Sequence, residues 1–270
     1  MKKLKILGVF AISAILFSCA EVPLTGRRQL SLVGDAGLQQ EANEAYRQFL
    51  SDPKTKVIRS STDAQRVKNV GAKIASAINR YMQTNGYGDK YRYNYEFNLI
   101  ESKDINAWCM PGGKVAVYTG LLPVTRDDAG LATVMGHEIA HAIAQHAAER
   151  ISQMTAAQVG GSVVGAAAGG RSQGTQQIIG QIYGVGGQLA ILNYSRKQES
   201  EADRLGLVFM AMAGYNPDNS VLFWNRMAAA KEGNGTPPEF LSTHPSDATR
   251  ISNIKQYLPE ARAYYTGAKK

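Results

Sequence analysis

Residues 136–146 read GHEIAHAIAQH and hold three of the chain's four histidines. His137 and His141 are four residues apart, so on an α-helix they lie on one face, one turn from each other. Two imidazoles in this arrangement can hold one zinc ion, and Glu138 beside them can act on a water at the open coordination position. We expect a helix over 127–152 to carry this H-E-x-x-H motif. The alternative, a chance pair of surface or core histidines, is much rarer at this spacing.

A third histidine, His146, lies five residues beyond the second. The longer metal-binding pattern H-E-x-x-H-x-x-G-x-x-H would need glycine at 144 and histidine at 147, but the sequence has Ala144 and Ala147. On a continuous helix His146 is also about 180° around the axis from His137. We therefore expect His146 to point away from the metal, as a solvent-facing or packing residue.

The third ligand has to come from farther along the chain, because no Asp, Glu, His or Cys occurs from Arg150 to Gln198. The next donors are Glu199, Glu201 and Asp203. Glu199 and Asp203 are four apart and share a helix face, whereas Glu201 is about 200° away from Glu199. A glutamate on the metal and a second carboxylate that orients a ligand histidine need such a shared face. Glu199 and Asp203 meet this requirement, and a solvated charged helix start is the alternative.

The whole pattern, H-E-x-x-H and then E-x-x-x-D within YSRKQESEAD, resembles the gluzincin zinc metallopeptidases of the HtpX and CAAX-prenyl-protease type. Three further segments are similar to the soluble envelope lipoprotein branch of that family, the LoiP- and BepA-like proteins. These segments are VPLTGRRQL at 22–30, NAWCMPGG at 106–113 and THPSDATR at 243–250. Cys109 departs from the family pattern at a position that tolerates apolar variety. The resemblance extends over nearly the whole chain after Cys19.

The resemblance implies a zincin-like metalloprotease core, in which a small antiparallel sheet lies beside the long H-E-x-x-H helix. His137, His141 and Glu199 would hold one Zn2+ per chain, and Glu138 would activate water.

Three further residues take supporting roles by the same resemblance. Asp203 would orient a ligand histidine. His244 would either steady the oxyanion of the tetrahedral intermediate or occupy the open metal position in a latent state. Arg250 would hold the His244 element or the Asp203 region. From the residues alone, a lone histidine before proline such as His244 is more often a helix cap or a surface residue.

Hydrophobic periodicity predicts an α+β, mainly helical fold with a single domain over 35–265. The Gly- and Ala-rich stretch 155–192 is expected to be a loosely packed helical hairpin, the alternatives being a mobile lid or a membrane-touching segment. Alternating residues predict paired strands within 91–102 and 109–122. Further helices are expected over 36–51, from Ser61 or Thr62 to Asn85, from about Ser200 to Ala213, from near Pro217 to Lys231, and after Pro245.

The N-terminus predicts a lipoprotein signal peptide over 1–18. Three lysines precede an apolar stretch of signal-peptide length, and the stretch ends in Leu16-Phe17-Ser18-Cys19. Cys19 would become the lipidated first residue of a tether over 19–34 that anchors the protein to a membrane. Because Ala20 and not aspartate follows, the outer membrane is the expected location. An ordinary secretory signal with a chance cysteine is the alternative.

Charge narrows the expected partners. The formal net charge is +8, of which three lysines lie in the signal segment, and no long basic run suggests a nucleic-acid groove. We expect a zinc metalloendopeptidase that acts on unfolded or misassembled envelope proteins, with the strand Lys114–Thr119 binding substrate by strand addition. The alternative is a zinc-latched chaperone or assembly factor for outer-membrane proteins with little proteolysis.

Overall fold

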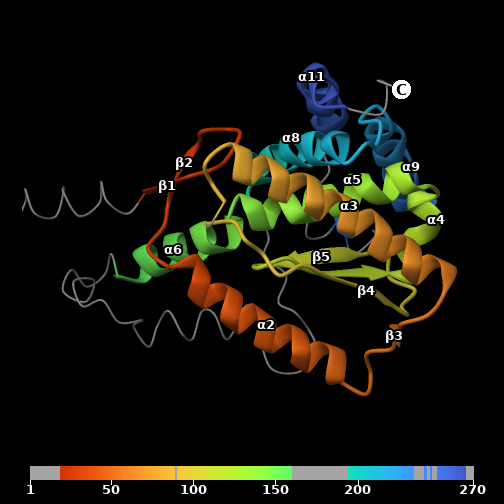
Figure 1. Ribbon diagram of the computed structural model, residues 1–270. Helices are drawn as coiled ribbons and strands as arrows, with labels where there is room; N and C mark the ends of the chain where they lie inside the picture. Colours follow the sequence, from red (N-terminus) through yellow and green to blue (C-terminus); the bar gives the residue numbers. More distant parts are fainter. Residues whose placement is uncertain are drawn as a thin grey trace, which may run out of the picture.

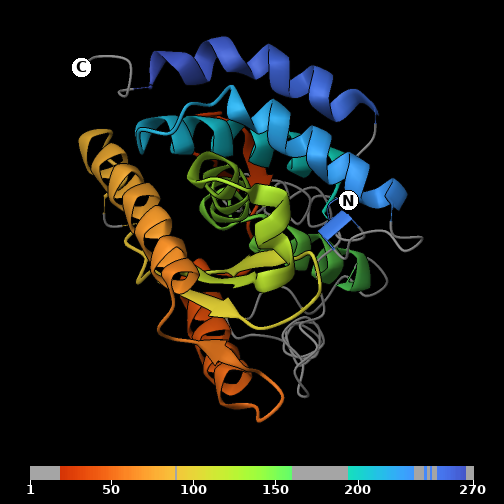
Figure 2. The same ribbon diagram turned by 90° about the vertical axis from the view of Figure 1, so that its right-hand side faces the viewer.

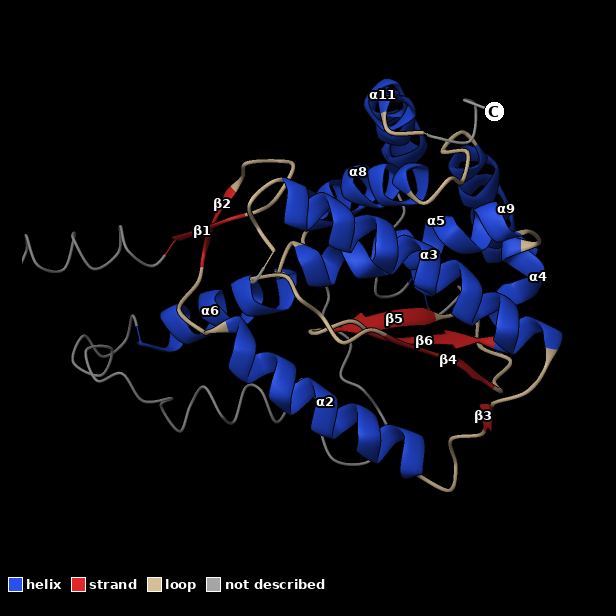
Figure 3. Ribbon diagram, viewed as in Figure 1, coloured by secondary structure: helices blue, strands red, loops and turns tan. Residues whose placement is uncertain are grey.

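The computed structural model of the protein describes residues 19–88, 90–159, 194–233, 240–241, 244 and 248–265. Helices dominate this part of the chain, so the predicted α+β, mainly helical class is confirmed (Figure 3). The helices are α2 (Asp35–Ser51), α3 (Thr62–Thr84), α4 (Leu122–Thr125), α5 (Asp128–Ile143), α6 (His146–Val159), α8 (Arg196–Met212), α9 (Asn219–Gly233) and α11 (Ala248–Ala263), with a 3-10 turn η1 (Thr119–Leu121).

The main sheet has the strand order β3-β4-β6-β5. Its strands are β3 (Val57–Ile58), β4 (Glu96–Ile100), β5 (Ala107–Met110) and β6 (Lys114–Tyr118). The expected antiparallel sheet is in fact mixed, because β4 and β6 are parallel while the other neighbouring pairs are antiparallel. The chain leaves β4, passes one strand position to form β5, and turns back so that β6 fills the centre. This topology puts β5 at an edge of the sheet.

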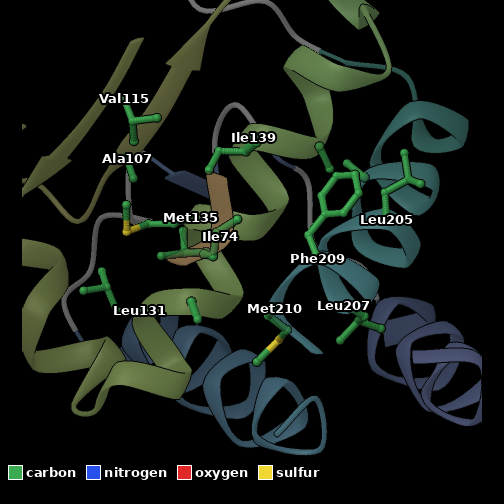
Figure 4. Packing of buried hydrophobic residues seen from close by; sticks show 14 of the residues in the cluster. Ile74, Ala107, Val115, Leu131, Met135, Ile139, Leu205, Leu207, Phe209 and Met210 are labelled. Carbon is green, nitrogen blue, oxygen red and sulfur yellow. The ribbon is translucent and has the colours of Figure 1, made fainter. Parts of the chain in front are cut away.

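The sheet separates two apolar cores. Along β6, Val115 and Val117 join the larger core, and Ala116 joins the smaller core beneath α2. Helices α3 and α5 cover one face of the sheet, with α8 and then α11 stacked above them, while α2 covers the other face (Figures 1 and 2). In the larger core, Met135 of α5 lies between the sheet and Phe209 of α8 (Figure 4).

Helix α5 lies at the centre of the molecule, and every residue from Gly130 to Ile143 is buried. A helix that is apolar nearly all round has to be surrounded by other elements, which α3, α8, α9 and the sheet provide. Its closest neighbour is α8. A Cβ at Gly136 would come within 2.9 Å of the Gly206 carbonyl oxygen, and a Cβ at Gly206 within 2.8 Å of the His137 nitrogen. The two backbones therefore touch where neither helix carries a side chain.

The predicted continuous helix over 127–152 is wrong. Helix α5 ends at Ile143 and α6 begins at His146. Gln145 between them has a left-handed backbone (φ 54°), which a continuing helix cannot contain. The C-terminal end of α5 is capped from the N-terminal segment, because the Gln29 side chain donates a 2.7 Å hydrogen bond to the Ala144 carbonyl.

The segment expected to be a tether packs against the body of the protein. β1 (Cys19–Glu21) and β2 (Arg28–Leu30) form a short antiparallel hairpin. Val22 between them is fully buried in the larger core. The Ser152 hydroxyl of α6 accepts hydrogen bonds from the backbone of Leu32 and Val33.

Other boundaries differ from the expectations in detail. Helix α8 starts four residues earlier than expected, because Ser195 and Gln198 form a capping box before the acidic cluster. The expected signal peptide, most of the 155–192 hairpin and Pro245 lie outside the described residues. Among the helices that the structure describes, none combines the length and apolar character needed to cross a membrane.

Substituting Gly136→Ala should destabilise the protein, because the added methyl group would force α5 and α8 apart. We expect a loss of about 1–3 kcal/mol in the free energy of unfolding, measured by urea denaturation. Gly34→Ala is the control, since a Cβ there meets no atom within 4 Å and φ is an ordinary −69°. Equal stability of the two variants would contradict the close approach.

Candidate metal centre

Four side chains that the sequence analysis selected meet in one buried cluster. His137 and His141 come from α5, Glu199 from the first turn of α8, and His244 from the segment before α11. One donor atom from each lies within 4.8 Å of all the others. The His137 and His141 Nε2 atoms are 3.2 Å apart, and His244 Nδ1 is 2.9 Å from Glu199 Oε1. All four residues are at most 4% exposed.

The chemistry of this cluster fits a zinc ion. Three imidazole nitrogens and one carboxylate oxygen are the donor types that zinc takes in a tetrahedral site. Glu199 Oε2 receives no hydrogen bond within the described part of the chain, although it is buried. Burial lowers the pKa of His141 well below its usual range, which keeps this imidazole neutral. Burial opposes the ionisation of Glu199, but His244 and His137 hold its pKa well below the usual range. A neutral imidazole and an ionised carboxylate are the forms that bind metal.

Glu138 lies at the edge of this cluster and faces β5. Its side chain is 3% exposed, and Oε1 is 3.4 Å from His244 Nε2. Burial raises the pKa of Glu138 to about 7, against the lowering effects of His244 and of a hydrogen bond from the Cys109 backbone. Glu138 Oε1 has no hydrogen-bond partner among the described residues. The site therefore presents a carboxylate with free acceptor capacity next to the four donors.

Asp203 and Arg250 hold His137 on the Nδ1 side of its ring. Asp203 Oδ1 lies 2.9 Å from His137 Nδ1, and Arg250 Nη2 donates to the same oxygen over 2.7 Å. The Arg250 guanidinium also lies 3.5 Å from the centre of the Trp224 ring, a cation–π contact. The structure thus places Asp203 against His137 and Arg250 against Asp203, while the part of these residues in metal binding or in any reaction stays a prediction.

His146 lies outside the four-donor cluster, as expected, but it is a packing residue against His141 and does not have the position that a continuous helix would give it. His146 is fully buried, and its Nδ1 is 2.9 Å from Nδ1 of His141. The break at Gln145 is the reason, because it cancels the half-turn offset that a continuous helix would impose. The other ring nitrogen of His146 is 3.0 Å from Glu201 Oε2.

Sequence reasoning also missed three residues around His141. Glu201 is buried against His146 and lies outside the four-donor cluster, which agrees with its expected absence from the metal. Arg27 reaches Glu201 from the N-terminal hairpin. Tyr194 stacks on the His141 ring with centroids 3.9 Å apart. The segment VPLTGRRQL, which resembles family lipoproteins, was the one signal that could have led to Arg27.

The strand expected to bind substrate, Lys114–Thr119, is in the sheet interior. Its β6 portion pairs with β4 on one side and with β5 on the other, so it has no edge to offer. The strand at the edge is β5, and Cys109 in its middle contacts Glu138 through the backbone. The strand edge next to Glu138 therefore belongs to β5.

Taken together, two histidines on a buried helix, a glutamate between them and a glutamate on a second helix define the class of zincin-type metal sites. A family model, Peptidase family M48, matches residues 63–258. The chain belongs to peptidase family M48, a family of zinc metallopeptidases, and the expected resemblance is confirmed at this level.

Proteins with similar sequences include mitochondrial OMA1 metalloendopeptidases and beta-barrel assembly-enhancing proteases. The mitochondrial metalloendopeptidase OMA1 of Schizosaccharomyces pombe is 33% identical over 241 residues, which cover 89% of this chain and 67% of that protein. The human mitochondrial metalloendopeptidase OMA1 is 30% identical over 88% of this chain and 46% of its own length. The beta-barrel assembly-enhancing protease of Yersinia pestis is 26% identical over 66% of this chain and 37% of its own length. The chain thus spans about half the length of most of these relatives.

Removal of metal should lower the stability of the folded protein, because a site of buried donors binds zinc only in the native state. After dialysis against a chelator, one equivalent of Zn2+ should raise the melting temperature. The expected gain is about 2.7 kcal/mol when free zinc is 100 times its dissociation constant. Glu199→Ala should lose most of this response. A wild type that binds no zinc, or a variant that responds equally, would contradict this metal site.

Proposed function

We propose that the protein is a zinc-dependent metalloendopeptidase whose metal is held by His137, His141 and Glu199. The observation that carries this proposal is the buried four-donor cluster with the Glu138 carboxylate beside it. Membership of a metallopeptidase family supports the reaction class. We also propose that one domain over 35–265 contains the whole site.

Zinc, when bound, would polarise the scissile carbonyl and lower the pKa of an attacking water. Glu138 takes a proton from that water, while the water oxygen attacks the carbonyl carbon. Glu138 then gives the proton to the leaving nitrogen, so that one water is consumed and an acid and an amine are released. His244 Nε2, which lies 3.4 Å from Glu138 Oε1, steadies the negative charge that develops on the carbonyl oxygen.

The β5 edge supplies a way to bind substrate. An extended polypeptide added to β5 as a further strand would place a peptide bond beside Glu138, which β5 contacts through Cys109. Strand addition uses backbone hydrogen bonds and makes little demand on side chains. This mode favours unfolded polypeptides as substrates.

The substrates we propose are unfolded or misassembled proteins of a bacterial envelope. The name of the Yersinia pestis relative, which refers to β-barrel assembly, supports this choice. The mitochondrial relatives are metalloendopeptidases as well, and they support the reaction without indicating the same compartment.

We further propose that Cys19 carries a lipid that anchors the protein to the outer membrane, facing the periplasm. The segment Leu16-Phe17-Ser18-Cys19 supports this proposal, and the Cys19 side of the hairpin is exposed. The hairpin that follows packs on the body, so the anchor would hold the body close to the membrane surface.

A second candidate function rests on the position of His244. Its Nδ1 is 3.3 Å from His137 Nε2 and 2.9 Å from Glu199 Oε1, so His244 can complete a closed four-ligand site. A closed site leaves no position for water, and its metal is structural in effect. In that case the protein is a zinc-latched chaperone or assembly factor for outer-membrane proteins with little proteolysis.

Casein hydrolysis by purified variants tests both candidates. Glu138→Gln should lower kcat/KM by about 10²–10⁴-fold because the general base is lost, while zinc content stays at one per chain. Hydrolysis by the pure variant at the wild-type rate would refute the protease mechanism. A rate that rises in His244→Ala indicates a latched protease. No hydrolysis by either wild type or His244→Ala would favour the chaperone.

Lipid attachment can be tested by expressing the full chain in bacteria with an alkyne-labelled fatty acid. The wild type should carry the label and sediment with membranes, and Cys19→Ser should lose both properties because the acylated thiol is gone. Cys109→Ser is the matched control, since it removes the chain's other cysteine and should keep both. Label retained by Cys19→Ser would contradict the proposed anchor.

A further inference from the structure

Two adjacent arginines in the N-terminal hairpin have different surroundings. Arg28 is exposed, whereas the Arg27 side chain is 14% exposed and lies between two acidic residues of the body. Its Nη1 and Nη2 atoms bind the two Glu149 oxygens over 2.8 and 2.9 Å, and its Nε donates to Glu201 Oε2 over 2.7 Å. The hairpin therefore places one largely buried cation against α6 and α8.

Glu201 connects this cation to the metal centre. Thr25 Oγ1 donates to Glu201 Oε1 over 2.6 Å, and His146 Nε2 is 3.0 Å from Glu201 Oε2. His146 Nδ1 is in turn 2.9 Å from Nδ1 of His141. A continuous path of hydrogen-bonding groups thus runs from the hairpin to one of the proposed zinc ligands.

One arrangement of protons satisfies every contact along this path. His141 can bind metal only through Nε2, which faces His137, so its Nδ1 carries the proton and donates to His146 Nδ1. His146 then carries its proton on Nε2 and donates to Glu201. Glu201 accepts from His146, Thr25 and Arg27, three donors that fix both of its oxygens. The path therefore fixes the tautomer and the ring orientation of His141.

We propose that Arg27 and Thr25 of the N-terminal hairpin, acting through Glu201 and His146, are positioning residues that hold His141 as a metal ligand. This inference rests on the metal site under Proposed function. Carboxylates that hold ligand histidines commonly set metal affinity. Here one histidine lies between the carboxylate and the ligand, and Arg27, which binds the carboxylate, lies 174 residues before Glu201 in the chain.

The other ligand histidine on α5 provides a comparison within the same site. His137 is held directly by Asp203, and Asp203 by Arg250. His141 is held by His146, His146 by Glu201, and Glu201 by Arg27. Each of the two histidines is therefore connected to a carboxylate and, through it, to an arginine. The path from His141 contains one more residue, His146, than the path from His137.

Substitutions at His146 test the central step, with zinc affinity measured by chelator competition. His146→Leu should weaken zinc binding by about 10–100-fold, because His141 Nδ1 loses its acceptor. His146→Asn should keep more of the affinity, since its amide oxygen can take the place of Nδ1. Visible spectra of the Co2+-substituted protein should change in His146→Leu. Equal zinc affinity for His146→Leu and the wild type would overturn the proposal.

Arg27→Met tests the remote end of the path, and Arg28→Met is the matched control with the same charge change. Arg27→Met should weaken zinc binding several-fold, and Arg28→Met should not. In a His146→Leu background the Arg27 effect should vanish, because the two residues act through one path. If Arg27→Met weakened zinc binding by the same factor in that background, Arg27 would only hold the hairpin against the body, and the proposal would be overturned.

Folding of each variant is followed by circular dichroism of the metal-free protein, so that a loss of structure is recognised. If His146→Leu does not fold, His146→Ala, which also removes the acceptor for His141 Nδ1, replaces it in the double variant, and the comparison of Arg27→Met with Arg28→Met still decides the outcome. Zinc affinity does not depend on peptide cleavage. A protein that binds zinc as described but cleaves no casein would refute the protease function and leave this inference intact.

Discussion

The close contact between α5 and α8 determines the geometry of the site. At Gly136 and Gly206 the backbones of the two helices meet without side chains between them. His137 follows Gly136 directly, and Glu199 lies seven residues, about two helical turns, before Gly206 on the same face of α8. The distance between the helices therefore sets the distance from the histidines to the glutamate. Larger residues at Gly136 and Gly206 would push the two helices apart and so separate the histidines from Glu199, although they would not touch these side chains.

Burial of charge is the second constraint. Glu149, Glu199, Glu201 and Asp203 are buried around the site, and they face the buried Arg250 and the largely buried Arg27. Removing a charged group from water costs several kcal/mol, so each carboxylate needs a partner. A fifth buried carboxylate, Glu138, has its pKa raised to about 7 by burial. The other four outnumber the two arginines by two, and a divalent cation among the donors would balance that difference. The two arginines explain why this much negative charge can lie inside a small protein around a metal site.

The sequence predicted the site well where the chemistry is local. The i, i+4 spacing of His137 and His141, and that of Glu199 and Asp203, follows from helix geometry alone, and the structure brings these residues together with His244. The order of the strands in the sheet was predicted less well. The pairing of β4 with β6 was predicted and is confirmed, but strand β5 was not predicted, and neither was the place of β6 between β4 and β5. Strand order depends on which apolar faces pack together, and that choice is made by the assembled core.

The sequence by itself determined the donor types, the pairing of His137 and His141 on one helix face and the donor-free gap that puts Glu199 on another helix. Tertiary structure alone decided the position of His146, because the break at Gln145 depends on a left-handed backbone residue beside a carbonyl that Gln29 binds from the N-terminal hairpin. It also decided that Arg27 and not Arg28 is buried. Adjacent residues of like chemistry differ only in the direction of their side chains, and that direction is fixed when the hairpin packs on α6 and α8.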